Sequence, residues 1–455
     1  MPTSSQSSSS PSLFPPAAPT AENPKFLYKL RGTERHYDAN GDLMPQVLWR
    51  QYTWSQMPAA VLTFPLTMYR FGQWCVDNQR NTYEPDVLVP RGEAKTGFVI
   101  KGECDESFIA PDPVERRRTG SFSAGDVTLI TWLTSDRLGR LVSLAEKRRA
   151  PISVAYYVPP NDKLASRDLI LLDKLYRTHP ALSQNVDIHL VTSPHLLQLN
   201  TWRTVARTFA STDWMLLWDA DFEACTDYQK GLERFLVETR SRGWADKLEQ
   251  GTAALVIAPF QWTDPVVERS RDLCPVDRDE LITMYRNLSM DAFETNTPIL
   301  SHATEYDRWI EVGETDYYEV TEYELGYEAY PLMRTDAEVW FDQRFAGYGY
   351  ERSAITAQMY LSGMDLYILP GEYGVHQEHS AAAVINTHDD IAAAKVPWMT
   401  FKMDICHTLG EVLAEQRVLH QPLGERLVST CKDMSIPPID RDIASQLEYS
   451  GRVQN

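Results

Sequence analysis

Residues 126–258 alternate between short apolar runs and amphipathic stretches, and this alternation restricts the fold more than any other feature of the chain. The apolar runs are typical of strands buried on both faces, and the stretches between them carry apolar residues at helical spacing. Such alternation predicts right-handed crossovers, and therefore an α/β fold with a mostly parallel central sheet flanked by helices. The predicted strands are Val127–Leu133, Ile152–Val158, Val186–Val191, Trp214–Trp218 and Ala253–Ala258, the last one stopped by Pro259. The predicted helices are Ser135–Arg149 (with Leu138, Leu141, Leu144 and Ala145 on one face), Asp162–Tyr176, Leu199–Ala210 and Tyr228–Arg242.

Two aspartates, Asp219 and Asp221, directly follow the apolar run Trp214–Trp218. Open α/β sheets bind their ligands at the carboxyl ends of strands, and residues two apart on an extended chain project to the same side. Carboxylates placed in this way can hold Mg²⁺ or Mn²⁺, and the cation can then hold a diphosphate. The alternative is that both aspartates belong to the turn that ends the strand, because aspartate is common in turns.

A third metal ligand is expected from the late part of the chain, where a short predicted strand at Leu366–Pro370 is followed by His376 and His379. An imidazole beside two carboxylates would favour Mn²⁺ over Mg²⁺. Asp219, Asp221 and one histidine would suffice, because these cations keep several positions for phosphate and water. The alternative is that both are surface histidines in a loop.

Other chemistries fit the chain less well. Enzymes that form a phosphoryl-aspartate intermediate also place Asp-x-Asp after an apolar strand. Their motif carries Thr or Val two residues later, where this chain has Glu223. No glycine-rich dinucleotide-binding turn follows Val127–Leu133, and the chain has no Gly-x-Ser-x-Gly elbow. Lys and Arg total 44 against 63 Asp and Glu, and the resulting net charge of -19 disfavours nucleic acid and anionic membranes as partners.

The cysteines and the search for targeting segments leave the compartment open. Scattered cysteines without a Cys-x-x-Cys pair indicate neither a zinc site nor a disulfide framework, although an oxidising compartment could still pair them. We find no signal peptide and no apolar run of the ~18–20 residues that a membrane helix needs. The tripeptide Asn287-Leu288-Ser289 is an N-glycosylation acceptor pattern that matters only if the protein is secreted. The six cysteines are Cys75, Cys104, Cys225, Cys274, Cys406 and Cys431.

The chain divides into four predicted parts. The first is rich in Ser and Pro and is predicted to be disordered. The second is predicted to pack on the main domain, with short helices at Val47–Met57 and Leu62–Asn78, and the last contains a predicted helix around Trp398–Gln416. The four parts are the tail at 1–23, the extension at 24–125, the main domain at 126–380 and a helical cap at 381–455.

Several segments of the main domain resemble glycosyltransferase family forty-nine, and they occur in the order found in that family. The family contains the LARGE-type xylosyl and glucuronyl transferases and the β-1,4-glucuronyltransferase of dystroglycan glycosylation. The resemblance covers about residues 125–380 and implies a GT-A type nucleotide-sugar fold, Mn²⁺ and inversion at the anomeric carbon. It also implies a UDP-sugar donor of the glucuronic acid or xylose type, a glycan or glycoprotein acceptor, and residence in the Golgi lumen. The segments are Asp126–Val158, Asn200–Arg203, Trp218–Asp221 and Arg344–Tyr350, continuing through Leu369-Pro370 to His376.

The resemblance also implies roles for individual residues by their position. Asp219 and Asp221 match the two metal-binding aspartates of the family, and Asp219 is expected to contact the substrate as well. His376 matches the late metal-binding histidine. Asn200 and Arg203 match an Asn-x-x-Arg motif that lies near the nucleotide.

Glu328 and Glu351 are the candidates for the catalytic base, because inverting transfer needs a carboxylate within hydrogen-bond reach of the acceptor hydroxyl. Glu328 ends the acidic and aromatic stretch Glu311–Glu328 and matches an acceptor-side Glu-Pro segment of the family, with Ala329 in place of Pro. Glu351 follows a glycine loop that permits close approach to a sugar, where animal members carry Asn. We place Glu328 ahead because its position matches the family.

The sequence therefore predicts a metal-dependent inverting glycosyltransferase. The alternative is a glycosyltransferase-like protein that binds nucleotide or glycan without turnover. A complete set of metal ligands favours the enzyme, and a missing base would favour the binding protein. The resemblance implies the Golgi lumen, whereas the missing membrane anchor leaves the cytoplasm possible, and no oligomeric state is predicted.

Overall fold

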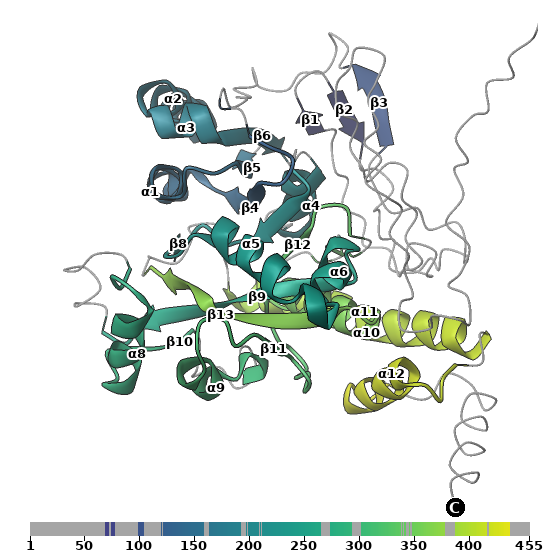
Figure 1. The fold of residues 1–455 in the computed structure, drawn as a ribbon. Helices are drawn as coiled ribbons and strands as arrows, with labels where there is room; N and C mark the ends of the chain where they lie inside the picture. The colour runs from purple at the N-terminus through teal and green to yellow at the C-terminus, as the bar shows by residue number, and fades with distance from the viewer. Residues whose placement is uncertain are drawn as a thin grey trace, which may run out of the picture.

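The computed structural model describes nine longer stretches of the chain, three short strands before residue 104 and a few single loop residues (Figure 1). The predicted tail at 1–23, the predicted helix at Val47–Met57 and the candidate ligand His379 lie outside the described residues. The division of the chain into four parts remains a prediction. The longer described stretches are 122–158, 163–192, 199–208, 212–264, 274–293, 302–337, 348–377, 387–415 and 418–436.

Ten of the described strands form one sheet. Its strands are β4 (Val127–Leu133), β5 (Ile152–Val158), β6 (Val186–Thr192), β7 (Trp214–Leu217), β8 (Phe222–Ala224), β9 (Ala253–Trp262), β10 (Met290–Ala292), β11 (Tyr318–Glu319), β12 (Tyr330–Arg334) and β13 (Asp365–His376). The order across the sheet is β6-β5-β4-β7-β12-β9-β13-β11, with β10 paired to β9 and β8 paired to β13. Strands β4 to β7 are parallel to their neighbours in this group, as are β9 and β13, whereas β12 is antiparallel to both β7 and β9. The predicted α/β fold with a mostly parallel sheet is confirmed.

The helices follow the predicted alternation with the strands. The face of the first helix predicted to be apolar is buried, because its three leucines and its alanine pack into the core. At the yellow end of the ribbon in Figure 1, α11 and α12 pack against each other. Within the described ranges, none of the helices has the length and apolar character needed to cross a bilayer. The helices are α1 (Leu138–Arg148), α2 (Lys163–Thr178), α3 (Pro180–Asn185), α4 (Leu199–Thr208), α5 (Tyr228–Glu238), α6 (Trp244–Glu249), α8 (Arg278–Arg286), α9 (Tyr306–Glu311), α10 (Glu351–Leu361), α11 (Thr387–Glu415) and α12 (Pro422–Asp433).

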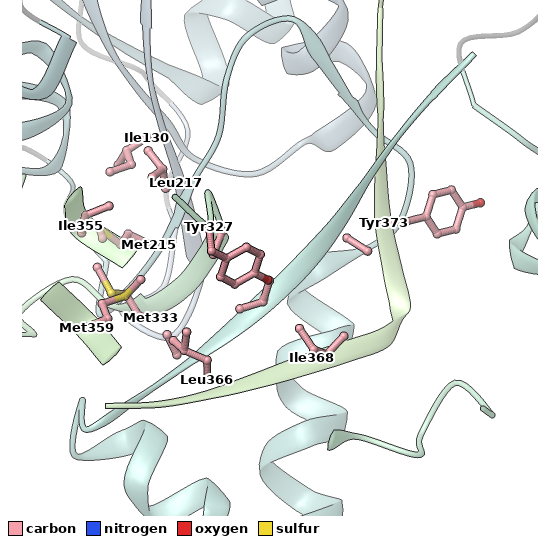
Figure 2. Close-up of a cluster of buried hydrophobic side chains, with 14 of the residues drawn as sticks. Ile130, Met215, Leu217, Tyr327, Met333, Ile355, Met359, Leu366, Ile368 and Tyr373 are labelled. Carbon is pink, nitrogen blue, oxygen red and sulfur yellow. The ribbon is translucent and has the colours of Figure 1, made fainter. Parts of the chain in front are cut away.

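Strand β7 is buried on both faces, as its apolar sequence predicts. Met215 and Leu217 belong to one hydrophobic cluster, part of which Figure 2 shows together with Met333 on the neighbouring β12. Trp214 and Leu216 point the other way, into a second cluster. The strand that leads to the two aspartates is therefore held by packing on each side, which fixes the position of its carboxyl end.

Strand β9 corrects one prediction, because it continues past Pro259 to Trp262. Strand β12 pairs with β9 only as far as Ile257, and the antiparallel pairing with β10 begins at Phe260. The missing N–H group of Pro259 falls between these two partners, where no antiparallel partner requires it. The Pro259 carbonyl still accepts hydrogen bonds, including one of 2.8 Å from the Tyr306 hydroxyl.

The predicted helix at Leu62–Asn78 is also wrong where the structure describes it. This part of the chain contains β1 (Tyr69–Phe71) and β2 (Trp74–Asp77), and β2 pairs in turn with β3 (Val99–Glu103). The aromatic residues that suggested helices covering the main domain favour extended chain, since they pack well on a pleated surface.

Among the described residues, two disulfides join four of the cysteines, which corrects the interpretation that the cysteines form no disulfide framework. Cys225, just after β8, is bonded to Cys274, just before α8, with Cα atoms 5.5 Å apart. Cys406 on α11 is bonded to Cys431 on α12, with Cα atoms 5.9 Å apart. The bonded residues are 49 and 25 positions apart in the sequence, and such pairings come from the fold rather than from local spacing.

A buried carboxylate, Glu372, lies at an irregularity in β13, where the pairing register with β9 shifts. The side chain of Glu372 is 4% exposed and contacts Arg234 of α5 at 3.1 Å. It packs so closely against α5 that a Cβ atom at Gly231 would lie 2.5 Å from its Oε1 atom. Burial raises the pKa of Glu372 from its ordinary value of 4.5 to about 7.

Glu372→Gln is therefore expected to make the free energy of unfolding less dependent on pH. Because the folded state holds the Glu372 proton more tightly than the unfolded chain, this group's contribution is fully present below pH 4.5 and is lost as pH rises through about 7. The loss amounts to at most about 3 kcal/mol. The free energy of unfolding should be measured with denaturant at pH 5 and at pH 8. Relative to the wild type, the value for Glu372→Gln should rise between the two pH values by up to that amount.

The matched control is Glu314→Gln, which removes the other carboxylate that contacts Arg234, at 3.4 Å. The Glu314 side chain is 54% exposed, so its removal should have little effect on the difference in unfolding free energy between pH 5 and pH 8. Equal behaviour of the two variants would contradict the assignment of the pH dependence to Glu372.

Candidate functional site

The turn that carries Asp219 and Asp221 is fixed by the buried side chain of Trp218. Its indole N–H donates a hydrogen bond of 3.0 Å to the Phe222 carbonyl, and the Phe222 N–H donates one of 3.1 Å to the Asp219 carbonyl. Gly374 of β13 permits this arrangement, since a Cβ atom there would lie 2.4 Å from the Trp218 ring. The two aspartates therefore occupy a rigid turn between β7 and β8.

Asp219 accepts hydrogen bonds from three different parts of the fold. Arg203 of α4 donates to its Oδ1 atom at 3.3 Å, and Arg352 of α10 and the Tyr330 hydroxyl of β12 donate to its Oδ2 atom, the latter at 3.1 Å. Burial alone would raise the pKa of the Asp219 carboxyl, but Arg352 and Arg203 outweigh it and hold that pKa below its usual value. Asp219 is therefore a carboxylate at neutral pH.

Each of the two arginines also connects Asp219 to one of the predicted base candidates. Arg203 lies 3.5 Å from Glu351, between Nη1 and Oε1. Arg352 donates two hydrogen bonds to Oε2 of Glu328, of 3.0 Å from Nε and 2.7 Å from Nη2. We call these five residues the arginine–carboxylate network. Residues predicted from distant parts of the sequence thus meet in one place.

The two glutamates differ in their surroundings. Oε1 of Glu328 accepts a hydrogen bond of 2.8 Å from the Ser353 hydroxyl. Oε2 of Glu351 accepts one of 2.8 Å from the N–H group of Gly349, whose φ of +105° needs glycine. Burial raises the pKa of Glu351 above its usual value, although Arg203 opposes the shift. Glu351 is thus the carboxylate that holds a proton more readily than usual.

Asn200 holds the arginine–carboxylate network in place through hydrogen bonds. Its Nδ2 atom donates hydrogen bonds of 3.0 Å to the backbone carbonyls of Asp342 and Glu351, and its Oδ1 atom accepts one of 3.2 Å from Arg203. The Asn200 side chain is fully buried. In the structure Asn200 orients Arg203 and the chain that leads into α10.

Asp221 contacts a different arginine. Arg137, which follows β4, lies with its Nε atom 2.7 Å from Oδ1 of Asp221 and its Nη1 atom 2.7 Å from Oδ2 of Asp136. The Arg137 side chain is 9% exposed. Both aspartates of the Asp-x-Asp pair therefore face guanidinium groups.

His376, the last residue of β13, is next to the aspartate turn. It pairs in register with Phe222 of β8, and the N–H group of the following residue, Gln377, donates a hydrogen bond of 2.8 Å to the Asp221 carbonyl. The imidazole packs near the rings of Phe222 and Phe293, with centroids 5.1 and 4.9 Å away. The backbone thus brings a histidine and two aspartates to the same edge of the sheet.

The donor chemistry of this edge fits Mn²⁺ or Mg²⁺, since it offers two carboxylates and an imidazole. The side chains are not assembled as a ligand cage, because no group of three or more His, Cys, Asp or Glu in the described part of the chain is arranged to hold a metal. Asp219 and Asp221 are engaged by arginines instead. A bound cation would have to replace those contacts.

Sequence reasoning missed three residues that the site brings together: Arg137, Tyr330 and Arg352. Arg352 has the most contacts, since it binds Asp219 and Glu328 and lies over the Tyr330 ring with its Cζ atom 4.4 Å from the centroid. The signal that could have found it is its position beside Glu351, where a glycine loop meets the start of a helix. Nothing in the local pattern marks Arg137 or Tyr330.

Arg203 gives a prediction that follows directly from these contacts. It is 2% exposed and is therefore not a solvated surface arginine. Arg203→Lys should keep one positive charge but lose the fork that contacts Asn200, Glu351 and Asp219. We expect the donor KM to rise by about tenfold, the cost of one charge-assisted hydrogen bond. Steady-state kinetics with the melting temperature as a folding check would measure this, and an unchanged KM would refute a donor role.

Comparison with known proteins gives a family match over the whole range predicted as the main domain. The sequence model of a family described as "Glycosyl-transferase for dystroglycan" matches residues 126–199 and 192–396. The chain is 25% identical over 287 residues to "Glycosyltransferase-like protein LARGE" of Caenorhabditis elegans, covering 61% of this chain and 41% of the relative. It is 29% identical over 269 residues to "Xylosyl- and glucuronyltransferase LARGE2" of Rattus norvegicus, covering 57% and 36%. The chain thus spans about two fifths of the length of these relatives.

Two solved structures are similar at low identity. One is S. aureus TarS 1-349, with a TM-score of 0.32 and 11% identity over 67% of this chain and 70% of that one. The other is GalNAc-T7 with UDP, GalNAc and Mn²⁺, with a TM-score of 0.35 and 12% identity over 71% and 56%. The topology of the sheet and the family match together confirm the predicted GT-A type of fold.

Proposed function

The chain belongs to the family of glycosyltransferases for dystroglycan, and on that premise we propose that it transfers a sugar from a UDP-sugar to a hydroxyl group of a glycan or glycoprotein. The observation that carries the proposal is the arginine–carboxylate network at the Asp-x-Asp turn. It places an ionised aspartate, two further carboxylates and two guanidinium groups at the carboxyl end of β7. Such a set can bind a diphosphate and accept a proton from an attacking hydroxyl.

In this proposal Asp219, Asp221 and His376 would hold Mn²⁺, or Mg²⁺ in its place. When bound there, the cation supplies positive charge that neutralises the diphosphate of the departing nucleotide. Arg203 and Arg352 fix the orientation of the carboxylates and bring further positive charge to the donor side. Because both guanidinium groups are buried, their charge is less screened by water than on the surface.

The proposed base is Glu328, which would take the proton of the acceptor hydroxyl as the new glycosidic bond forms. Two hydrogen bonds from Arg352 and one from Ser353 hold its carboxylate in one orientation, as a positioned base requires. Glu351 is the second candidate, because its raised pKa brings its basicity closer to neutral pH. Loss of the base should slow transfer by orders of magnitude but leave nucleotide binding intact.

The donor is proposed to be UDP-glucuronic acid or UDP-xylose, which follows from the names of the relatives rather than from a contact in this chain. The proposed setting is the lumen of the secretory pathway, including the Golgi. The two disulfides support it, because disulfides persist mainly in oxidising compartments.

A second candidate function is nucleotide or glycan binding without turnover. The observation in its favour is that both aspartates of the Asp-x-Asp pair contact arginines, which could replace a cation permanently. In that case the arginines would bind an anionic ligand and no metal would be required.

One experiment separates the two functions. The purified chain is incubated with a panel of UDP-sugars, with Mn²⁺ or with a chelator, and the release of UDP is measured. If the chain is an enzyme, it should release UDP from one or two of the UDP-sugars, and this release should require the cation. Binding of UDP or a UDP-sugar without release, equal with and without chelator, would instead support the silent binding protein.

A further inference from the structure

The turn after α8 carries the single Asn-x-Ser/Thr pattern of the chain, Asn287-Leu288-Ser289. Asn296 comes close to a second, but it is followed by Thr297 and Pro298, which do not complete the pattern. A single pattern of three residues arises easily by chance. Its meaning therefore depends on where the fold places it.

The fold places this tripeptide on the surface, in a well-ordered helix end. Leu288 adopts the left-handed conformation with φ of 63°, and Ser289 N–H donates a hydrogen bond of 2.9 Å to the Met284 carbonyl. This is the Schellman arrangement that ends many helices. The Thr263 hydroxyl donates to the Leu288 carbonyl at 2.7 Å and ties the turn to the end of β9.

Asn287 itself is exposed, and only one end of its amide is used. Its Oδ1 atom accepts a hydrogen bond of 3.0 Å from the Ser289 N–H group. In the part of the chain that the structure describes, its Nδ2 atom, the atom that receives a glycan, has no hydrogen-bond partner. Leu288 beside it is 77% exposed, an apolar side chain without cover.

A disulfide at the opposite end of the same helix supplies the second, independent observation. Cys274 lies just before α8 and is bonded to Cys225, so the helix that ends at Asn287 is tied to the sheet by a bond typical of oxidising compartments. The second disulfide, between Cys406 and Cys431, also indicates an oxidising compartment. The oxidising secretory pathway is also where asparagine-linked glycans are attached.

We propose that Asn287 is an N-glycosylation site. The reaction joins Nδ2 of Asn287 to the anomeric carbon of an oligosaccharide carried by a lipid diphosphate. The bond between that carbon and the diphosphate oxygen breaks, the lipid diphosphate leaves with the bonding electrons, and the amide loses one proton. The host transferase and its lipid-linked oligosaccharide are the co-reactants. The attached glycan would cover Leu288, and the turn that carries it contributes no residue to the arginine–carboxylate network.

The test is to express the full chain behind a secretory leader in a eukaryotic cell line and digest it with a peptide-N-glycosidase. The wild type should show a mobility shift of one glycan, and the peptide containing Asn287 should carry Asp at that position after digestion. The shift should be lost completely in Asn287→Gln and in Ser289→Ala. It should be retained in Ser289→Thr, which restores the hydroxyl that the pattern requires.

Two controls keep the result interpretable. Asn296→Gln should leave the shift unchanged, because Pro298 stands where the pattern requires Ser or Thr. Mass mapping should establish that the Cys225–Cys274 disulfide has formed, which shows that the chain reached the oxidising compartment. An unmodified Asn287 peptide in disulfide-bonded protein would overturn the proposal, as would a shift that persists in Asn287→Gln.

Discussion

Replacing Asp219 with Asn is expected to lower kcat/KM for sugar transfer by about a thousandfold. The substitution keeps the shape of the side chain but removes the negative charge that the proposed cation requires. It also takes from Arg203 and Arg352 the carboxylate that both contact. Initial rates of UDP release with the preferred donor, at several Mn²⁺ concentrations, measure the effect.

Asp365→Asn is the matched control for the loss of a buried ion pair. Asp365 is fully buried and contacts Lys247, but it begins β13, whereas the proposed site lies where that strand ends. Breaking either pair should destabilise the fold by about 3 kcal/mol. The folded fraction of Asp365→Asn should keep its kcat. A comparable loss of kcat in both variants would mean that the effect of Asp219→Asn is structural.

Glu328→Gln is expected to lower kcat for transfer to an acceptor by about 10²–10⁴-fold, the usual contribution of a general base. Gln can keep its carbonyl oxygen towards Arg352 and donate from Nε2 to the Ser353 hydroxyl, which can itself donate to the Gly326 carbonyl, so the orientation of the side chain should be largely preserved. The affinity for UDP with Mn²⁺ should stay near that of the wild type. Single-turnover kinetics and UDP binding, measured on the same preparation, separate the two effects.

Glu351→Gln is the comparison that ranks the two candidates. It should lower kcat less than Glu328→Gln does, because the proposed role of Glu351 is mainly to balance the charge of Arg203. The pH dependence of kcat gives an independent readout, since the acidic limb should disappear in the variant that lacks the base. If Glu351→Gln loses transfer and Glu328→Gln does not, the order of the two candidates is reversed.

Most elements from β4 to α5 could be predicted because their signal is local, whereas the short elements α3 and β8 were not predicted. The apolar run Val127–Leu133 and the helical spacing of the leucines after it are complete within a few residues, and both are confirmed. Pro259 was misjudged because its effect depends on which strands lie beside it. The two disulfides depend on contacts between segments 25 or more residues apart, for which the sequence has no local signal.

The candidate site shows the same division. Asp219, Glu328 and Glu351 were predicted from strand ends, a glycine loop and a resemblance, and the fold brings them together. The arginine that joins two of them was not predicted, because an arginine at the start of a helix is usually solvated and only the fold buries Arg352. The contact between Arg137 and Asp221 likewise joins the ends of two neighbouring parallel strands.

The proposal that Asp219, Asp221 and His376 hold the cation is tested most directly by Mn²⁺ binding in the presence of UDP. Electron paramagnetic resonance of the free ion measures that binding. The wild-type chain should bind one Mn²⁺, and Asp219→Asn and His376→Ala should bind it at least about tenfold more weakly, because each has lost a ligand. Asp365→Asn should bind it as the wild type does. No Mn²⁺ bound by the folded wild type with saturating UDP, or equal binding in all four proteins, would contradict the account.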